Sequence, residues 1–310
     1  MRTVEFYIHV FAHEMHDFQR TVETLKRNLA FVSQDKVHFN ITCNVSEYHY
    51  DWSKSKIPPS FFVSQFEGLC SMLPNVSTHI EYFEEYGCNT VRRIGARKCS
   101  KDFVGYLDLD LHFSNYTLFY MLEAIDKLTI EPFDWNREDK VIVSGQIPRL
   151  WDDTWNVISN DTFIQMGVES KIWLTMDPYS LDSLVHSEIE TLGLKELPYI
   201  KIGGGWMNLI ETSLLNMIDI PDSFGAYGRD DTFIGDSCNI LNEKQLTTIK
   251  QYVIDGLLVA ENRKYQDYEP YLNDNMVILK TGDDYKKQKA REAEHIYNLE
   301  INKMLKRFEK

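Results

Sequence analysis

The chain has 310 residues, 43% of them hydrophobic and 26% charged, which is ordinary for a globular protein that buries one substantial core. Its formal net charge of −14 argues against a protein that binds duplex nucleic acid, because such a protein needs a basic surface to displace counterions from phosphate. An anionic substrate would have to meet a local cation or a metal ion.

Neither the cysteines nor the N-terminus indicates export. The five cysteines are odd in number and lack CxxC spacing, which favours idle thiols in a reducing compartment over a disulfide framework. The N-terminus enters a strand-like segment without the apolar core of a signal peptide. No uncharged apolar run approaches the ~20 residues of a membrane span. We therefore expect a cytoplasmic protein.

Strand-like and helix-like segments alternate along the first half of the chain. Short apolar or alternating runs predict strands, and apolar residues at helical spacing predict helices. We expect strands over residues 4–11, 37–45, 78–83 and 103–107, and helices over 17–31, 61–73 and 116–128. This alternation favours βαβ units and a mostly parallel sheet flanked by helices.

The second half is less regular. We expect strands over residues 140–144 and 199–202, helices over 181–192 and 207–217, and either a helix or a strand over 246–258. Residues 284–310 have the pattern of a long amphipathic helix, and the part from Lys286 to Lys310 has eight Lys or Arg against four Glu. Such a helix suits a membrane surface, a partner helix or an oligomer contact, and packing against its own domain is the simplest interpretation.

The apolar strand from Phe103 to Leu107 ends in Asp108-Leu109-Asp110. Because side chains alternate along a strand, Asp108 and Asp110 point to the same side. At the carboxyl end of a parallel strand, this pair would project into the crevice where α/β sheets bind ligands. Two such oxygen donors suit Mn²⁺ or Mg²⁺, with His112 as a further ligand or a phosphate contact. The alternative is a turn with two solvated aspartates.

A second acidic pair, Asp230-Asp231, ends the glycine-bearing segment 225–231. Adjacent carboxylates can supply a general base whose pKa is tuned by burial and by neighbouring charge. Arg229 would temper their mutual repulsion. A polar turn that caps a helix near Thr232 accounts for the same residues without any chemistry.

Glycines and cations supply further candidates. In Gly203-Gly204-Gly205-Trp206 the backbone can approach a ligand closely and Trp206 can stack on a sugar ring, although a tight turn with a core tryptophan is the plainer interpretation. The densest basic cluster of the first half would pair with a diphosphate or form a solvated helix face. It consists of Arg92, Arg93, Arg97 and Lys98.

In combination these segments resemble the GT-A glycosyltransferases, most closely the family 2-like inverting enzymes. Residues 4–11 look like their first strand, 95–98 like the alanine-arginine-asparagine turn before the donor strand, and 103–110 like the strand with its DxD motif. Residues 203–206 resemble their glycine-rich turn, and 225–231 the glycine-tryptophan-glycine, glutamate-aspartate motif of galactosyltransferase relatives. This chain departs from the family at Lys98, Tyr227 and Arg229.

The resemblance implies a nucleoside-diphosphate sugar as donor, a glycan or glycoconjugate as acceptor, and a single displacement that inverts the anomeric carbon. Asp230 would be the catalytic base, Asp231 would orient the acceptor, and Asp110 with Asp108 would hold Mn²⁺ or Mg²⁺, with His112 as the further candidate ligand. The implied donor-binding residues are Val10, Phe11, Arg97, Asp108, Asp110, Gly204, Gly205 and Trp206.

The implied organisation is a GT-A catalytic domain over residues 1–260, followed by a helical extension over 261–310. Within the catalytic domain, residues 1–115 would bind the nucleotide sugar and residues 116–260 the acceptor. The last helix adds a possible site of contact with a membrane surface or with a second copy of the chain.

Three other functions compete with this one. A haloacid-dehalogenase-like phosphohydrolase also has Asp-x-Asp after a strand, and Gly235-Asp236-Ser237 faintly matches its last acidic motif. Against it, His112 stands where that class carries Thr or Val, and a whole βαβ region precedes the motif. A nucleotidyltransferase lacks support because no lysine-rich glycine loop follows the first strand. The non-enzymatic alternative is a carbohydrate-binding or scaffold protein on a transferase fold.

Overall fold

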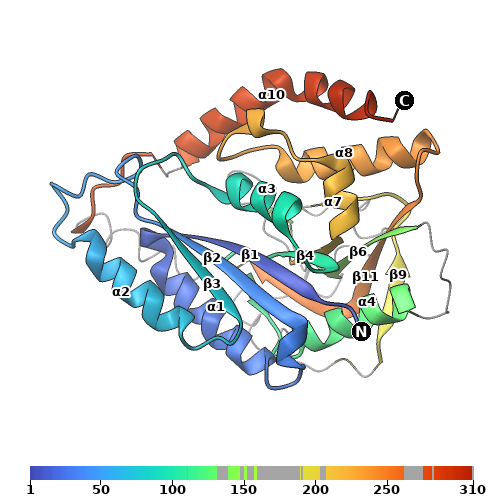
Figure 1. The fold of residues 1–310 in the computed structure, drawn as a ribbon, viewed down its shortest axis with the longest axis horizontal. Helices are drawn as coiled ribbons and strands as arrows, with labels where there is room; N and C mark the ends of the chain where they lie inside the picture. Colours follow the sequence, from blue (N-terminus) through green and yellow to red (C-terminus); the bar gives the residue numbers. More distant parts are fainter. Residues whose placement is uncertain are drawn as a thin grey trace.

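The computed structural model describes residues 1–109, 111–130, 139–146, 150–151, 157–158, 189, 191–202, 207–261, 275–280 and 283–308. These residues form a central β-sheet with helices on both of its faces (Figure 1). The expected mixed α/β fold with a mostly parallel sheet is confirmed.

The central sheet has nine strands in the order β3-β2-β1-β4-β10-β6-β11-β5, and β9 pairs with β11 beside this path. β3, β2, β1 and β4 are parallel, β10 is antiparallel to both β4 and β6, and β6 is parallel to β11. Six strands therefore run in one direction, and β10, β5 and β9 run in the other. The bounds are β1 Val4–Phe11, β2 Val37–Asn44, β3 Val76–Glu81, β4 Phe103–Tyr106, β5 Leu111–Phe113, β6 Lys140–Gln146, β9 Gly193–Glu196, β10 Asn208–Glu211 and β11 Ile249–Glu261. A separate two-stranded sheet pairs β7 (Leu150–Trp151) with β8 (Val157–Ile158).

Two hydrophobic cores lie on the two faces of the sheet, because neighbouring side chains of a strand point to opposite faces. In β4, Phe103 belongs to the core beneath α1 (Met15–Asn28), α2 (Pro59–Cys70) and α4 (Thr117–Ile130). Val104 belongs to the core beneath α3 (Cys88–Lys98), α7 (Thr212–Ile218), α8 (Asp230–Glu243) and α10 (Asp283–Leu305). Three short 3₁₀ helices complete the described elements: η1 (Ala12–Glu14), η2 (Gln34–Lys36) and η5 (Asp222–Phe224).

The elements predicted for the first half match the structure within a few residues, but the sequence did not predict α3 or β5, and two predictions in the second half were wrong. Residues 199–202 are not a strand, because side-chain amides bind their backbone in place of a neighbouring strand: Asn239 bonds to both the N–H and the C=O of Ile200, and Gln251 does the same for Lys201. The helix predicted over 207–217 begins with strand β10 instead, since Asn208–Glu211 pairs with strands on both sides.

Three further segments of the second half can be compared with their predicted elements. Residues 246–258 mostly form strand β11, one of the two predicted states. Of the helix predicted over 181–192, residues 181–188 and 190 lie outside the described residues, and 189, 191 and 192 are not helical. Strand β9 was not predicted.

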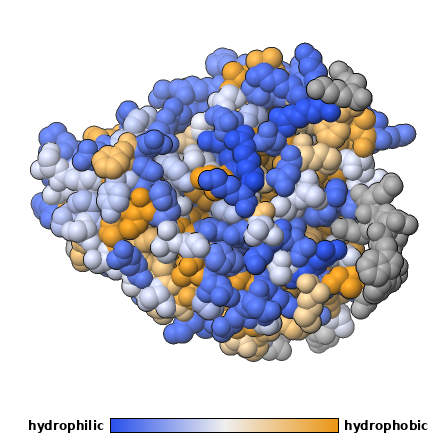
Figure 2. All heavy atoms as spheres, in the orientation of Figure 1, coloured by the Kyte–Doolittle hydropathy of each residue, from blue (hydrophilic) through white to orange (hydrophobic). Residues whose placement is uncertain are grey.

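The C-terminal helix α10 packs against its own chain, at α8 and η5. Its apolar face is buried there, with Ala293 1% exposed and Met304 0% exposed. The surface seen in Figure 2 over α10 is mostly hydrophilic, with small apolar spots. In the described part of the chain, no helix combines the length and the apolar character needed to cross a membrane.

Candidate active site

The acidic motifs of the sequence meet at the carboxyl ends of the parallel strands. β4 ends at Tyr106, so Asp108 lies just past the end of that strand, and α8 begins at Asp230. Helix α3 lies between them and contacts β1 and β4. The site is thus built from a strand end, a helix start and one helix that supplies a cation.

Arg92 of α3 links the two motifs. Its Nη2 donates to Asp108 Oδ1 at 2.9 Å, and its Nη1 donates to Asp230 Oδ2 at 2.8 Å. The side chains of Arg92 and Asp230 are 9% and 5% exposed, whereas that of Asp108 is 33% exposed. One buried guanidinium therefore bridges a buried carboxylate and one that faces solvent.

The surroundings of Arg92 keep it charged. Burial alone would lower its pKa, but the carboxylates of Asp230 and Asp108 more than offset this, so its pKa lies above the ordinary value. The guanidinium carbon also lies 5.4 Å from the centre of the Tyr106 ring, in reach of a cation–π contact. Arg92 is therefore a permanent positive charge in the site.

A narrow gap, too small to admit a water molecule, borders Asp230. It is lined by Arg92, Tyr106, Ile202, Asn208, Asp230, Asp231 and Ile234. Asn208 is 1% exposed and belongs to a buried polar chain in which Gln251 donates to Ser144 and Ser144 donates to Asn208. The gap thus brings two carboxylates, a cation and a fixed amide together with Tyr106 and two isoleucines.

The segment before Asp230 is held from two sides. On one side, the N–H of Asn89 donates to Ala226 O at 3.1 Å, and its Nδ2 donates to Gly228 O at 3.0 Å. On the other side lies α10: a Cβ at Gly228, where φ is +96°, would meet the Ala290 Cα at 2.6 Å. Arg229 binds Glu294 of α10, so Arg92, and not Arg229 as expected, is the ion-pair partner of Asp230.

A cluster of aromatic rings and imidazoles gathers around Phe11 at the end of β1. The ring centres of His9, His13, His49 and Tyr227 lie 4.5 to 6.1 Å from that of Phe11. Burial, followed by nearby positive charge, lowers the pKa of both His9 and His13 to about 3. Both imidazoles are therefore neutral at physiological pH. No motif in the sequence indicated this cluster.

Several of the predicted site residues cannot be placed. Asp110, Gly204, Gly205 and Trp206 lie outside the described residues. Among the residues that are described, no group of three or more His, Cys, Asp or Glu side chains is placed to hold a metal ion.

His112 and Arg97 have other partners. His112 Nε2 lies 3.1 Å from Arg20 Nη1, so its lone pair faces a guanidinium. Arg97 binds Asp219 and Asp222 at 2.8 Å each. It lies at the end of α3 that leads into β4, whereas Asp108 follows the other end of that strand. The structure therefore does not bring Arg97 to Asp108 or Asp230.

Val10 and Phe11, two residues predicted to bind the donor, are buried. They are 0% and 1% exposed, backbone included, so a nucleotide base could not meet them without a rearrangement. All five cysteines are free thiols, in line with the expected absence of a disulfide framework.

No protein-family model matches the chain, and no curated protein matches it either. Among solved structures, it is similar to S. aureus TarS. The structure of TarS 1–349 in complex with UDP gives a TM-score of 0.49 at 13% identity, over 93% of this chain and 69% of that chain. The complex with UDP-GlcNAc gives 0.46 at 11% identity, over 82% and 58%. The longer S. aureus TarS gives 0.49 at 12% identity, over 86% of this chain, which spans only 38% of that chain.

Proposed function

We propose that this protein is a metal-dependent glycosyltransferase that moves a sugar from a nucleoside-diphosphate sugar to a hydroxyl group of a glycan or glycoconjugate, with inversion. The observation that carries the proposal is the double ion pair of Arg92, which places Asp108 and Asp230 in one site at the carboxyl ends of the strands. Within this proposal, residues 1–115 bind the donor and 116–260 the acceptor.

Asp230 is the catalytic base in this mechanism. Its Oδ2 is held by Arg92, and among the described residues its Oδ1 has no hydrogen-bond partner. The acceptor hydroxyl gives its proton to Asp230 while its oxygen forms a bond to the anomeric carbon. The bond from that carbon to the diphosphate oxygen breaks, and the diphosphate leaves with the electron pair. Asp231 orients the acceptor.

Asp108 and Asp110 are the residues that would hold a divalent cation. Asp108 suits this role, because it is one-third exposed and its ion pair with Arg92 uses only Oδ1. A bound Mn²⁺ or Mg²⁺ supplies positive charge to the departing diphosphate. Arg92, which is charged at every physiological pH, adds to the positive potential on the same side.

The decisive experiment separates donor binding from turnover. Purified protein is screened for nucleotide release from UDP-, GDP- and TDP-sugars with and without Mn²⁺, beginning with UDP-GlcNAc. Asp230→Asn should abolish release and keep the Mn²⁺-dependent thermal stabilisation by the nucleotide. Turnover that survives in Asp230→Asn, with donor affinity lost instead, would remove Asp230 from the role of base. Stabilisation by simple phosphate analogues alone would favour a phosphohydrolase.

A further inference from the structure

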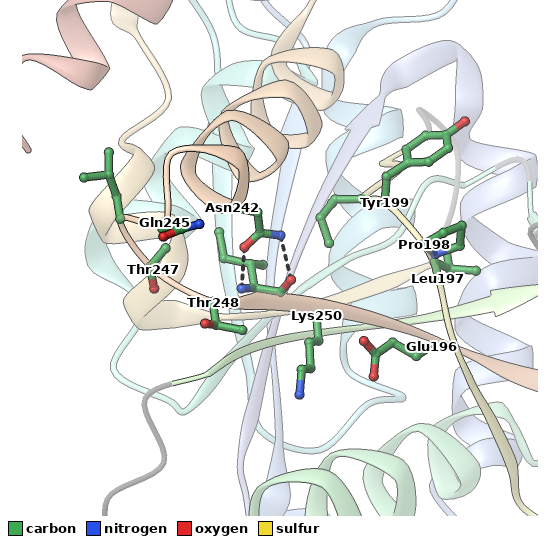
Figure 3. Close-up of a pocket in the computed structure, with 12 residues that line it drawn as sticks. Glu196, Leu197, Pro198, Tyr199, Asn242, Gln245, Thr247, Thr248 and Lys250 are labelled. Atoms are coloured by element: carbon green, nitrogen blue, oxygen red, sulfur yellow. Dashed lines mark hydrogen bonds between the residues drawn. The ribbon is translucent and has the colours of Figure 1, made fainter.

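A second cavity, of about 510 Å³, opens at the start of β11, between the end of α8 and the segment after β9. Figure 3 shows Gln245, Thr247 and Thr248 on one side of it and Glu196, Leu197 and Pro198 on the other. A volume of this size falls within the range of small-molecule sites. Nothing in the proposed mechanism uses it.

The cavity is remote from the candidate active site. Asp230 begins α8, and the cavity lies just beyond the other end of that helix. Fourteen helical residues span about 20 Å. The cavity also borders the amino end of β11, which runs in the same direction as β4, whereas Asp108 lies past the carboxyl end of β4. The two sites therefore lie at opposite ends of the parallel strands.

One wall of the cavity is held by internal hydrogen bonds, and another carries polar side chains that bond to no other described residue. The amide of Asn242 donates to Ile249 O at 2.8 Å and accepts from Ile249 N at 2.7 Å, and Figure 3 draws both bonds. In contrast, the side chains of Gln245, Thr247 and Thr248 have no hydrogen-bond partner among the described residues. An amide and two hydroxyl groups can both donate and accept, as the hydroxyl groups of a sugar do.

The charges around the cavity favour a neutral ligand. Glu196 accepts a hydrogen bond from Tyr252 at 2.9 Å, and Lys250 binds Asp139 at 2.9 Å. Each charged side chain of the lining is thus already engaged, and the two charges of the lining cancel. Among the described lining residues, a phosphate or carboxylate would find no cation without a partner.

The backbone supplies an independent indication. Gln245 has a φ of 55°, in the left-handed region that usually falls to glycine or asparagine at the end of a helix. The N–H of Leu246 donates to Leu241 O at 3.0 Å, as in such helix ends. Glycine would meet the requirement of the turn without strain, so the glutamine is not explained by the turn itself.

We propose that this cavity is a second carbohydrate site, which binds a neutral glycan through Gln245, Thr247 and Thr248. The role of this site in holding an extended acceptor rests on the proposed function. Glycan binding at the site does not depend on it. The ligand is recognised by hydroxyl groups, without the charge or the metal that a nucleotide sugar needs.

Binding is tested on the full chain with maltotriose, cellotriose and chitotriose, by saturation-transfer NMR followed by calorimetry. Gln245→Gly should not lower the thermal midpoint, because it relieves the left-handed residue, yet it should weaken binding about tenfold, the cost of one or two lost hydrogen bonds. Lys244→Ala, at an exposed neighbour outside the lining, should bind as the wild type does.

The outcomes separate this site from the active site. Oligosaccharide binding that survives Asp230→Asn and is weakened in Gln245→Gly supports the proposal, even if no sugar donor is ever turned over. If none of the three oligosaccharides binds the wild-type chain, or if Gln245→Gly binds as tightly, the proposal is overturned. Loss of donor turnover in Asp230→Asn tests the active site alone.

Discussion

Arg92 of α3 and Asp230 at the start of α8 form a 2.8 Å ion pair in which both side chains are at least nine-tenths buried. The same guanidinium binds Asp108, so the acid after β4 and the acid at the start of α8 share one counter-ion. A change at Arg92 therefore acts on both acidic motifs at once.

Arg92→Met should lower the free energy of unfolding by about 3–5 kcal/mol, because it leaves the buried carboxylate of Asp230 without its cation. Urea denaturation at neutral pH measures this. Arg92→Lys should recover only part of the loss, since an ammonium group lacks the fork that binds two carboxylates. Lys98→Met, at an exposed cation of the same helix, is the matched control.

A double variant checks that the ion pair is responsible. Combined with Asp230→Asn, Arg92→Met should cost less than the two single losses added together. Strict additivity would mean that Arg92 stabilises the fold through packing alone.

Asp108→Asn should weaken the Mn²⁺-dependent binding of UDP at least about tenfold, because an amide is a poorer ligand than a carboxylate for a divalent cation. Thermal shift against UDP concentration, with and without Mn²⁺, measures the loss. Asp139→Asn is a close control: Asp139 is 35% exposed and its ion pair also spans 2.9 Å, yet it lies with Lys250 at the opposite edge of the sheet. Equal losses in the two variants would contradict a metal role for Asp108.

Gly228→Ala should destabilise the fold by about 1–3 kcal/mol, because residue 228 has a positive φ and the new methyl group would press on the backbone of α10. Gly68→Ala makes the same chemical change inside α2, where a Cβ meets nothing within 4 Å, and should stabilise by about 0.5–1 kcal/mol. Thermal unfolding of the pair compares them. Equal changes in stability in the two variants would indicate that α10 can move away from residue 228 at no cost.

The free energy of unfolding should fall as the pH drops from about 6.5 toward 3. His9 has an ordinary pKa of 6.5 when unfolded, and burial followed by the charges of His49, Lys286, His13 and Arg92 lowers it to about 3 in the fold. Between these values the unfolded chain binds more protons, so each such histidine contributes a slope of up to about 1.4 kcal/mol per pH unit.

His9→Phe keeps the ring beside Phe11 and removes one titrating group, so the slope between pH 6 and 4 should become shallower. Chemical denaturation at a series of pH values gives that slope. The exposed His295 supplies the control, since its replacement should leave the slope as it is in the wild type. An unchanged slope in His9→Phe would mean that His9 is protonated in the folded protein.

Local pattern was enough to predict the first strand, since residues 4–11 are an apolar run and form β1 over those same residues. It was not enough for the basic cluster. The sequence grouped Arg92 with Arg97 as possible diphosphate partners, but the helix turns one toward Asp230 and carries the other to Asp219. No local signal connects Asp108 with Asp230, because only the packing of α3 brings them to the same guanidinium.

The same limit explains the errors after residue 198. Apolar residues at 199–202 resemble a strand, yet whether a neighbouring strand is available depends on distant residues, and here Asn239 and Gln251 occupy that place. Asn208–Glu211 carries no strong strand pattern of its own. It becomes a strand because β4 and β6 leave a gap of one strand between them.

The gap between β4 and β6 affects the order in which the sheet can assemble. Among the described strands, β4 and β6 do not pair with each other, and the two parallel parts of the sheet are joined through Asn208–Glu211, which enters about a hundred residues after β4. During synthesis, β3, β2, β1 and β4 can assemble early, but the sheet stays open at its middle until this short strand arrives. Closure therefore depends on late, long-range contacts, which are the slow kind in folding, and a chain stopped before residue 208 would expose the edges of both β4 and β6 to aggregation.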